Sequence, residues 1–340
     1  ACAGGVCGGG DMNAALVVTA PGTAACIQDL GRFGHRRIGV PWSGTLAPEL
    51  LAIANRLVGN EDGAPGIECF AGGQAFTAGD AAVRVAVAGD AELEVEAHGV
   101  VRHVPAWQSL RLLPGETLRI RALHDGRVAL LALAGADVPK ALGSASAHAR
   151  SGLGGGWLAA GTRIECAAAP VQPEWRLDDV PMTTDAPIRV IAGPQMEHFT
   201  AETWNTFLNA EYRIGQAADR MGMRLDGPTL AHRDAASRDI VSDAVIPGAV
   251  QVPGHGQPIV LLADAQTAGG YPKIACVISA DLPRLATRKP GEAVRFACVD
   301  AATGEAAARA AHAALQTRLA KLRRLTAEGI DLAALYPEND

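Results

Sequence analysis

Apolar and polar residues alternate along much of the first half of the chain. Between residues 80 and 135 the apolar positions recur at every second residue, as in Val83–Val87, Leu93–Val95 and Leu118–Ile120. This period of two is typical of half-buried β-strands. Turn-forming pairs separate the runs: Gly89-Asp90, Pro114-Gly115 and Asp125-Gly126. Short strands at this spacing predict an antiparallel barrel or sandwich rather than a parallel α/β sheet.

The second half repeats the short apolar runs after a polar, proline-bearing segment at residues 168–186. These runs predict strands at Ile188–Ala192, Ala249–Val252, Ile259–Leu262, Ile274–Ile278 and Val294–Val299. Helical spacing of the apolar residues predicts helices at Pro48–Val58, Glu197–Leu208 and Ala306–Leu325. The last helix has an apolar stripe of Ala311, Leu315, Leu319 and Leu322. The stripe favours packing on the second domain, with docking of a partner as the alternative.

These elements predict a chain that is mainly β with a few helices. At 340 residues the chain is long for one domain and comfortable for two. We therefore expect two β-rich domains and a C-terminal helix. The expected boundaries are a flexible leader at 1–11, an N-terminal domain at 12–170, a C-terminal domain at 187–300 and the helix at 301–328.

Composition and charge exclude several classes of protein. Hydrophobic residues make up 49% of the chain and charged residues 19%, which is the balance of a protein with a buried core. The net charge of −6 gives nothing to attract a polyanion, so no nucleic-acid partner is expected. No apolar run approaches the roughly 18 residues that span a bilayer, so no membrane partner is expected either.

The cysteines and histidines indicate a reduced, cytoplasmic protein without a metal site. The 7 cysteines are scattered and odd in number, which makes a poor disulfide framework. No two of the 9 histidines share a ligand spacing on one element. The glycine-rich opening lacks the apolar core of a signal peptide, so residues 1–11 are interpreted as a flexible leader. A metal clip of Cys2 and Cys7 is the alternative there.

The sequence contains no catalytic triad order, H-E-x-x-H, phosphate-binding loop or G-x-G-x-x-G. The candidate functional residues lie instead in three stretches rich in glycine and polar side chains. The first stretch extends from Gln28 to Gly44 and contains Asp29, Arg32 and Ser43. Its glycines let the backbone approach a ligand closely. Asp29 and Arg32 are candidates either for contact with a ligand or for an ion pair with each other.

The second stretch, Asp219–Gly227, contains two arginines. A guanidinium group binds a planar carboxylate through two parallel hydrogen bonds. Arg220 lies beside Asp219 and is expected to be buried or half-buried. It is a candidate either for a clamp on the substrate or for a buried ion pair with Asp219. Asp219 and Arg224 are further candidates for contact with the substrate.

The third stretch lies between the apolar runs at 259–262 and 274–278 and carries the most hydrogen-bonding groups. Gly269 and Gly270 free two backbone amides that can face an oxyanion or a carbonyl oxygen. A carboxylate, a hydroxyl, a cation and other polar side chains accompany them: Asp264, Thr267, Lys273, Gln251, Gln266 and Tyr271. So many polar groups between apolar strands favour a functional site over a rigid turn.

Together these stretches resemble the KipA/PxpC family, which is related to allophanate hydrolase subunit 2 and to the A/B half of the urea carboxylase carboxyltransferase domain. The similar strings are QDLGRFG (28–34), GVPWSG (39–44), ANRLVGN (54–60), GPQ (193–195), DRMGMRLDG (219–227), QVPGHGQPIVL (251–261) and DAQTAGGYPKI (264–274). The resemblance covers about residues 15–300. It implies a cyclophilin-like β-barrel, a partner subunit of the KipI/PxpB type and, in bacteria, a third subunit of the PxpA type.

The chain departs from the family pattern at three polar positions. The acid of the usual Ser-Gly-Ala-Met-Asp is replaced by Ala47, and the arginines of two later motifs are replaced by Ala145 and Trp157. Their joint loss indicates that one polar network is missing. If that network binds an anionic ligand in the family, this chain has a weakened or changed version of that role.

The function that the resemblance implies is that of the C subunit of an ATP-dependent 5-oxoprolinase. Such a complex opens the lactam of 5-oxoproline, a small carboxylate, to glutamate. The expected roles are Arg220 on the carboxylate or phosphate, Gly269, Gly270 and Thr267 at the oxyanion, Asp264 orienting water, and Lys273 neutralising phosphate. One alternative is a biotin-dependent carboxyltransferase subunit that holds carboxybiotin in the same pocket. Another is a regulator without activity that binds a KipI-type partner.

Overall fold

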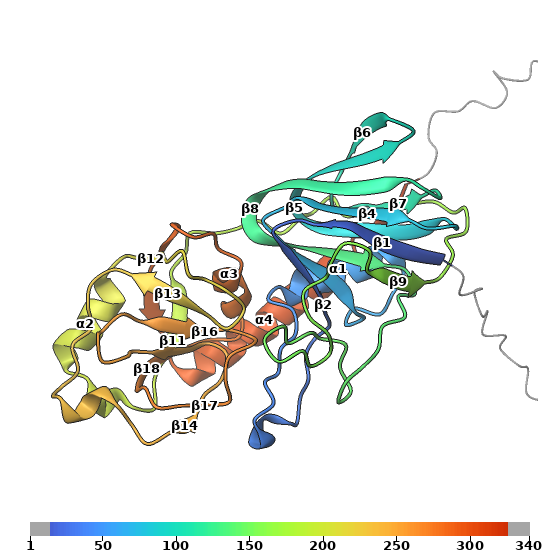
Figure 1. The fold of residues 1–340 in the computed structure, drawn as a ribbon. Helices are drawn as coiled ribbons and strands as arrows, with labels where there is room; N and C mark the ends of the chain where they lie inside the picture. Colours follow the sequence, from blue (N-terminus) through green and yellow to red (C-terminus); the bar gives the residue numbers. More distant parts are fainter. Residues whose placement is uncertain (1–13, 326–340) are drawn as a thin grey trace, which may run out of the picture.

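The computed structural model describes residues 14–325, which fold into two β-rich halves (Figure 1). Within this range the first half is a nine-stranded antiparallel sheet with the order β2-β3-β8-β4-β1-β9. Strand β5 joins the sheet through β8 and also pairs with β6 and β7. The strands are β1 (Ala14–Pro21), β2 (Ala24–Gln28), β3 (Gly66–Phe70), β4 (Gln74–Ala78), β5 (Val83–Ala97), β6 (Val100–Val104), β7 (Ser109–Leu112), β8 (Thr117–Leu133) and β9 (Arg163–Cys166).

Strands β5 and β8 are longer than the sequence pattern predicted. The turns predicted at Gly89-Asp90 and Asp125-Gly126 are wrong, because both strands continue through them. The pairing shifts register on each side of Asp90, while Gly89 and Gly126 take φ angles of 134° and 73°. An irregularity of this kind bends a strand and strengthens its twist without ending it. The glycines therefore curve the sheet into a half-barrel.

The second half is an eight-stranded sheet with the order β19-β12-β13-β16-β15-β18-β11-β20, curved into a nearly closed barrel. Its pairs are antiparallel except for β11 and β20. The strands are β11 (Ile188–Ala192), β12 (Tyr212–Ile214), β13 (Gly222–Asp226), β15 (Ala249–Gln251), β16 (Ile259–Leu261), β18 (Lys273–Val277), β19 (Ala293–Val294) and β20 (Phe296–Cys298). Two short ribbons pair β10 (Trp175–Arg176) with β21 (Arg323–Arg324) and β14 (Asp243–Ala244) with β17 (Ala268–Gly269). The predicted class, mainly β with a few helices, is confirmed.

The helices begin and end where local chemistry favours it. Helix α1 (Pro48–Val58) has the predicted bounds, because proline suits its first turn and Gly59 ends it with a φ of 85°. The single helix predicted near residues 197–208 is instead a short 3₁₀ turn, η2 (Met196–His198), followed by α2 (Ala201–Asn209). The remaining short helices are η1 (Arg36–Ile38), η3 (Ala236–Arg238) and α3 (Leu282–Ala286).

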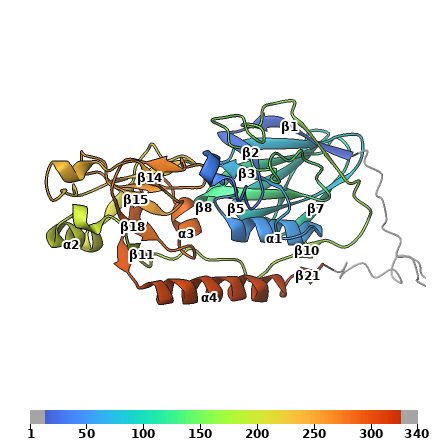
Figure 2. The same cartoon turned by 90° about the horizontal axis from the view of Figure 1, so that it is seen from below.

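Helix α4 (Ala301–Leu319) runs beneath both halves of the molecule (Figure 2). It begins before the predicted Ala306, because the Asp300 side chain accepts a hydrogen bond of 2.8 Å from the Thr303 amide. It ends before the predicted Leu325, because the chain continues into β21. Leu319 is buried, whereas Ala311 of the predicted stripe is exposed. Only part of the stripe therefore packs against the protein.

The hydrophobic core continues across the junction of the halves. One cluster joins Leu51 and Leu57 of α1 to Leu130 of β8 and to Val250 and Ile274 of the second barrel. A second cluster fills the first half-barrel around Leu16, Phe76, Val85 and Leu118. Because apolar contacts run through the junction, the halves are held together by packing as well as by polar groups.

Two expectations concern the chain as a whole. The predicted leader at 1–11, with Cys2 and Cys7, lies outside the described residues. Across residues 14–325 no helix combines the length and apolar character needed to cross a membrane. The cysteines of this range are free thiols: Cys26, Cys69, Cys166, Cys276 and Cys298.

Candidate functional site

Loops from both halves meet at the junction. They are residues 29–47, between β2 and α1, and residues 262–272, between β16 and β18. The Ser43 amide donates a hydrogen bond of 3.0 Å to the Ala263 carbonyl and so joins the two loops. Gly44 has a φ of 87°, and a Cβ there would lie 2.8 Å from the Leu30 carbonyl oxygen. Only glycine lets the first loop fold back on itself at this point.

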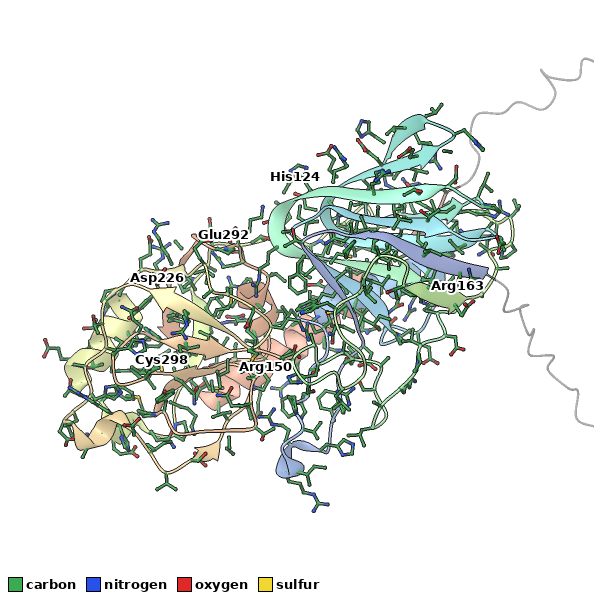
Figure 3. The ribbon with its side chains drawn as sticks, viewed as in Figure 1. His124, Arg150, Arg163, Asp226, Glu292 and Cys298 are labelled. Carbon is green, nitrogen blue, oxygen red and sulfur yellow. The ribbon has the colours of Figure 1, made fainter. Side chains whose placement is uncertain are left out.

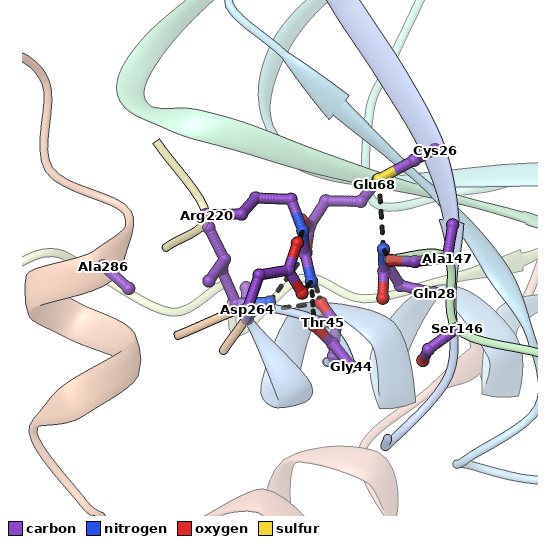
Figure 4. A network of polar contacts seen from close by, with 12 residues as sticks. Cys26, Gln28, Gly44, Thr45, Glu68, Ser146, Ala147, Arg220, Asp264 and Ala286 are labelled. Atoms are coloured by element: carbon purple, nitrogen blue, oxygen red, sulfur yellow. Dashed lines mark hydrogen bonds and ion pairs between the residues drawn. The ribbon is translucent and has the colours of Figure 1, made fainter. Parts of the chain in front are cut away.

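A buried ion network lies directly beneath these loops (Figure 4). The Arg220 Nε donates to Asp264 at 2.9 Å, its Nη2 donates to the Gly44 carbonyl at 2.6 Å, and its Nη1 contacts Glu68. The Glu68 carboxylate also accepts hydrogen bonds from Thr45 at 2.8 Å and from the Leu46 amide at 2.7 Å. The network therefore links β3 and the 29–47 loop of the first half to two loops of the second.

Pairing with carboxylates explains how Arg220 stays charged although it is buried. Burial lowers the pKa of a guanidinium, but the carboxylates of Glu68 and Asp264 raise the pKa of Arg220 above its ordinary value. Arg127 of β8 brings a second cation, and its guanidinium donates to the Ala218 carbonyl at 2.9 Å and to that of Ala286 at 3.0 Å. Buried charges are tolerated when paired and hydrogen-bonded in this way.

The network decides what Arg220 and Asp264 can do. Both side chains are nine-tenths or more buried, and their hydrogen-bonding groups are directed at protein partners. The alternative pairing of Arg220 with Asp219 is wrong, because Asp219 is exposed and accepts hydrogen bonds from the amides of Met221 and Gly222. The geometry of Arg220 is thus that of a joint between the two halves.

Cys26 lies beside this network, and its chemistry can be excluded. Burial raises the pKa of the Cys26 thiol to about 12. The thiol therefore stays protonated near neutral pH, whereas nucleophilic attack needs the thiolate. Cys26 instead accepts a hydrogen bond of 3.1 Å from the Gln28 side chain.

Asp29 and Arg32 organise a loop of the first half. The Asp29 carboxylate accepts hydrogen bonds from the hydroxyls of Ser144 at 2.6 Å and Ser146 at 2.5 Å, and from the Ala145 amide at 2.7 Å. Arg32 donates instead to backbone carbonyls, at 2.8 Å to Ala141 and 2.7 Å to Ser146. The expected direct ion pair between them is wrong, since each side chain binds the 141–147 loop.

Lys273 is buried and forms an ion pair. Its Nζ lies 2.7 Å from Asp243 and donates to the Ala244 carbonyl at 3.1 Å. The hydrogen bond from Lys273 lowers the pKa of Asp243. Gln195 donates to the same carboxylate at 3.3 Å and accepts from the Lys273 amide at 3.2 Å. The close approach needs Gly193, where a Cβ would lie 2.0 Å from the Lys273 carbonyl oxygen.

Two side-chain amides lie near Gly269, next to this pair. A Cβ on Gly269 would lie 2.6 Å from the Gln251 Nε2 and 3.5 Å from the Gln266 Nε2. Gln251 is 2% exposed, and its Nε2 makes no hydrogen bond. This Nε2 is one of several buried side-chain atoms without a partner in residues 14–325, and it is the one that lies beside the third polar stretch. We name these three residues the Gly269 cluster.

The other residues of the third stretch surround this cluster. Thr267 is half-buried, and its backbone carbonyl accepts a hydrogen bond of 3.2 Å from the Val245 amide. Gly270 accepts a hydrogen bond of 2.8 Å from the Ile240 amide through its carbonyl. Tyr271 is 42% exposed. Arg224 is an exposed residue on β13 and joins none of these contacts.

The 29–47 loop closes one side of the junction. Ser43 takes a φ of 53°, which is unusual for a residue other than glycine, and its buried Oγ has no hydrogen-bond partner. Arg36 stacks over Trp42 at 5.0 Å and donates to the Gln266 carbonyl at 3.3 Å and to that of Val245. Loops of the two halves therefore touch beside the Gly269 cluster.

Several residues of the site escaped sequence analysis. Glu68 sits between Ile67 and Cys69 in an apolar run, and a charge in such a run requires a buried partner. Arg127 follows a glycine that was interpreted as a turn. Arg36 and Asp243 lie in polar loops that carry no distinguishing pattern. Only Glu68 therefore had a recognisable sequence feature.

The three lost family residues do not share one role in this structure. Ala47 is the N-cap of α1, which has no side-chain cap. Ala145 is buried and donates its amide to Asp29. Trp157 is half-exposed and meets Phe70 edge-on, with the ring centroids 6.0 Å apart. The loss at Ala47 thus removes a helix cap from this chain's own fold.

Metal-ligand side chains group at one place in the described part of the chain. Glu92, Glu94 and His103 lie on the β5–β6 hairpin, with their ligand atoms within 4.8 Å of one another. Glu94 already lies 3.5 Å from Arg121. This hairpin belongs to the first half and takes no part in the loops at the junction.

Comparison with known proteins places the fold and the site in a family. Residues 38–298 match the family described as carboxyltransferase domain, subdomain A and B. The chain is 32% identical over 294 residues to the C subunit of the 5-oxoprolinase of Escherichia coli (strain K12), which covers 83% of this chain and 90% of that protein. The family match covers most of both β-rich halves. The chain belongs to the carboxyltransferase A/B subdomain family.

Two solved structures have the same fold. The Kluyveromyces lactis urea carboxylase matches with a TM-score of 0.80 and 23% identity over 89% of this chain and 29% of that one. TTHA0988 matches with a TM-score of 0.72 and 34% identity over 83% of this chain. The present chain spans 55% of the TTHA0988 chain. The family fold therefore occurs alone and as part of longer polypeptides.

Proposed function

We propose that this chain is the C subunit of a 5-oxoprolinase-type complex, which opens the lactam of 5-oxoproline to glutamate at the expense of ATP. The Gly269 cluster carries the proposal. A lactam and its ring-opening intermediate present oxygens that need hydrogen-bond donors, and the buried Gln251 amide is a donor without an acceptor. The similarity to a relative named as a 5-oxoprolinase subunit supports this choice over other lactam chemistry.

The polar residues have roles that differ from those expected from the sequence. Gln251 and Gln266 bind substrate oxygens, with Thr267 beside them, while Gly269 pairs with Asp243 in the β14–β17 ribbon. Lys273 provides positive potential for a carboxylate, reduced by its pairing with Asp243. Arg220 and Asp264 hold the loops in register as positioning residues. This division follows from the hydrogen bonds already made by each group.

In this proposal the described site does not hold ATP. The sequence carries no phosphate-binding loop, and the ammonium of Lys273 is already shared between Asp243 and a backbone carbonyl. We therefore assign ATP binding to a companion subunit of the KipI/PxpB or PxpA type. The contribution of this chain is to bind and orient the lactam.

The second candidate function is a biotin-dependent carboxyltransferase subunit, which the family description favours. The same neutral donors suit the ureido carbonyl of biotin, because that group also accepts hydrogen bonds without a full charge. A regulator that binds a KipI-type partner without catalysis is a third outcome. A regulatory function does not account for the unpartnered Gln251 Nε2.

One reconstitution separates these functions. The chain is combined with its companion chains, and glutamate release from 5-oxoproline with ATP is compared with consumption of carboxybiotin. ATP-dependent glutamate release that requires this chain is the expected result. Carboxybiotin turnover would replace the proposal with the second function. A stable complex with neither activity would favour the regulator.

A further inference from the structure

Exposed apolar side chains lie on segments of both halves near the Gly269 cluster. The 29–47 loop exposes Phe33 by 60% and Ile38 by 67%. The second half exposes Val241 by 93%, together with Ile246 and Tyr271. We name these five residues the junction patch. Apolar residues grouped on a surface are typical of an interface, whereas single ones need no explanation.

Contacts between the loops hold the two parts of this patch together. Arg36, two residues before Ile38, donates to the backbone at Gln266 and at Val245, which precedes Ile246. The Ile240 amide binds the Gly270 carbonyl at 2.8 Å, which joins the segments that carry Val241 and Tyr271. The patch therefore belongs to one preformed surface.

The residues directly before Ile38 are the cations Arg36 and Arg37, although the whole chain is negative. Arg37 is exposed and makes no ion pair or side-chain hydrogen bond within residues 14–325. Arg36 donates only to carbonyls, and Arg150 contacts the Met221 sulfur at 3.0 Å, at the junction of the halves (Figure 3). The nearby acids are the exposed Asp239 and Asp243, and Asp243 is already paired with Lys273. The net charge of the chain is −6.

We propose that the junction patch is the docking face for a companion protein whose contact surface is apolar at its centre and carries carboxylates opposite Arg37. The docked companion covers the Gly269 cluster and shields it from water, which strengthens the hydrogen bonds made there. This inference rests on the proposed function only in taking the chain to be one member of an enzyme complex.

Two observations favour a companion protein as the occupant of the patch. The Escherichia coli relative is named as a subunit, and the TTHA0988 chain has nearly half its length beyond the part that this chain matches. A second copy of this chain is disfavoured, because a two-fold contact places the same patch on both sides and brings the Arg37 side chains of the two copies into the same interface. Like charges facing each other across an interface oppose binding.

The test uses one substitution in the patch and a matched control outside it. Ile38→Asp places a charge in the patch, and Val100→Asp makes the same change at a residue of β6 that is 69% exposed. Each full-length variant is titrated calorimetrically with the companion chains from the same source. Ile38→Asp is expected to weaken binding at least tenfold, and Val100→Asp to leave it unchanged. Circular dichroism checks that both variants fold.

A charge-reversal variant tests the complementarity of the two surfaces. Arg37→Glu is expected to weaken binding more at 50 mM than at 500 mM salt, because salt screens the lost attraction. Equal binding by wild type and Ile38→Asp, or no binding by any companion chain, overturns the proposal. A wild-type dimer in light scattering that Ile38→Asp converts to monomer also overturns it, in favour of a second copy.

The outcomes distinguish a failure of the docking face from a failure of the proposed function. A complex that Ile38→Asp dissociates, but that releases no glutamate, leaves the docking face standing and removes the proposed function. Glutamate release that continues undiminished with Ile38→Asp removes the docking face and leaves the function standing.

Discussion

The two polar regions at the junction are built in opposite ways. Around Arg220 every charged group meets another charge or a backbone partner, and the region is closed to water. Around Gly269 the donors are neutral, and the Gln251 Nε2 has no partner. The charges around Arg220 therefore hold the halves together, whereas the neutral donors around Gly269 are the groups that we propose for a ligand. A motif rich in arginine and aspartate can thus be structural even when it lies next to a site.

The prediction with the largest expected effect removes the cation Arg220 from its buried network. Arg220→Met leaves Glu68 and Asp264 buried without their partner, which costs about 3–5 kcal/mol of unfolding free energy. Urea denaturation followed by circular dichroism measures the change. Arg224→Met is the control from the same stretch, and its exposed side chain should change stability by less than about 0.5 kcal/mol. Similar stabilities for the two variants would contradict a structural role for Arg220.

The next test uses the pH dependence of a second buried carboxylate. Burial raises the pKa of Asp29, but hydrogen bonds from Ser144, Ser146, Gly31 and Ala145 lower it below its ordinary value overall. A lowered pKa in the folded state gives stability that is present above the ordinary pKa of about 3.9 and is lost as the pH falls through the folded value.

Asp29→Asn should therefore cost about 2 kcal/mol at pH 7, since hydrogen bonds to charged groups contribute this much. The difference from wild type should shrink as the pH falls below about 4. Urea titrations at pH 7, 4 and 2.5 follow it. A difference that stays constant with pH would show that the Asp29 charge does not support the 141–147 loop.

A third test addresses the Gly269 cluster. Gln251→Leu removes the unpartnered amide but keeps a buried side chain of similar size, so stability should stay the same or rise slightly. Activity of the reconstituted complex should fall at least about tenfold, which corresponds to roughly 1.4 kcal/mol. Initial rates of glutamate release measure the effect. Full activity in Gln251→Leu would mean that the amide does not contact the substrate.

The smallest expected effect concerns Ala47. Ala47→Asp supplies the missing N-cap of α1, and a side-chain cap stabilises a helix by about 1 kcal/mol. Thermal unfolding should show a higher melting temperature, while activity stays at the wild-type level. A large gain in activity without a gain in stability would instead assign the lost family acid a role in the chemistry.

The sequence predicted the features that depend on neighbouring residues. Alternation located the strands, and the proline and glycine at its ends located α1 to the residue. It failed where partners are far apart in the chain. Glu68 and Arg220 are 152 positions apart, and no local pattern relates them. The path of β8 through Gly126 was also missed, because a glycine in a bulge and a glycine in a turn have the same local sequence.

The candidate site was predicted in part for the same reason. The third stretch was recognised because Gln251, Gln266, Gly269 and Lys273 lie close together along the chain. Whether Lys273 is free or paired depends on Asp243, which belongs to another segment, just as the pairing of Arg220 depends on Glu68. Long-range pairing therefore decides which polar residues remain free to bind a ligand.

The course of α4 has a consequence for how the polypeptide can be cut. Beyond the second barrel this helix returns to the first half, where Arg318 contacts Glu49 of α1, Lys321 lies 2.7 Å from Asp179 and β21 pairs with β10. A protease that nicks the connecting segment near Met182, which is 87% exposed, would therefore leave two fragments that stay clasped to each other. The protein lends itself to assembly from separately expressed pieces, and the position of the break would leave its surface at the junction intact.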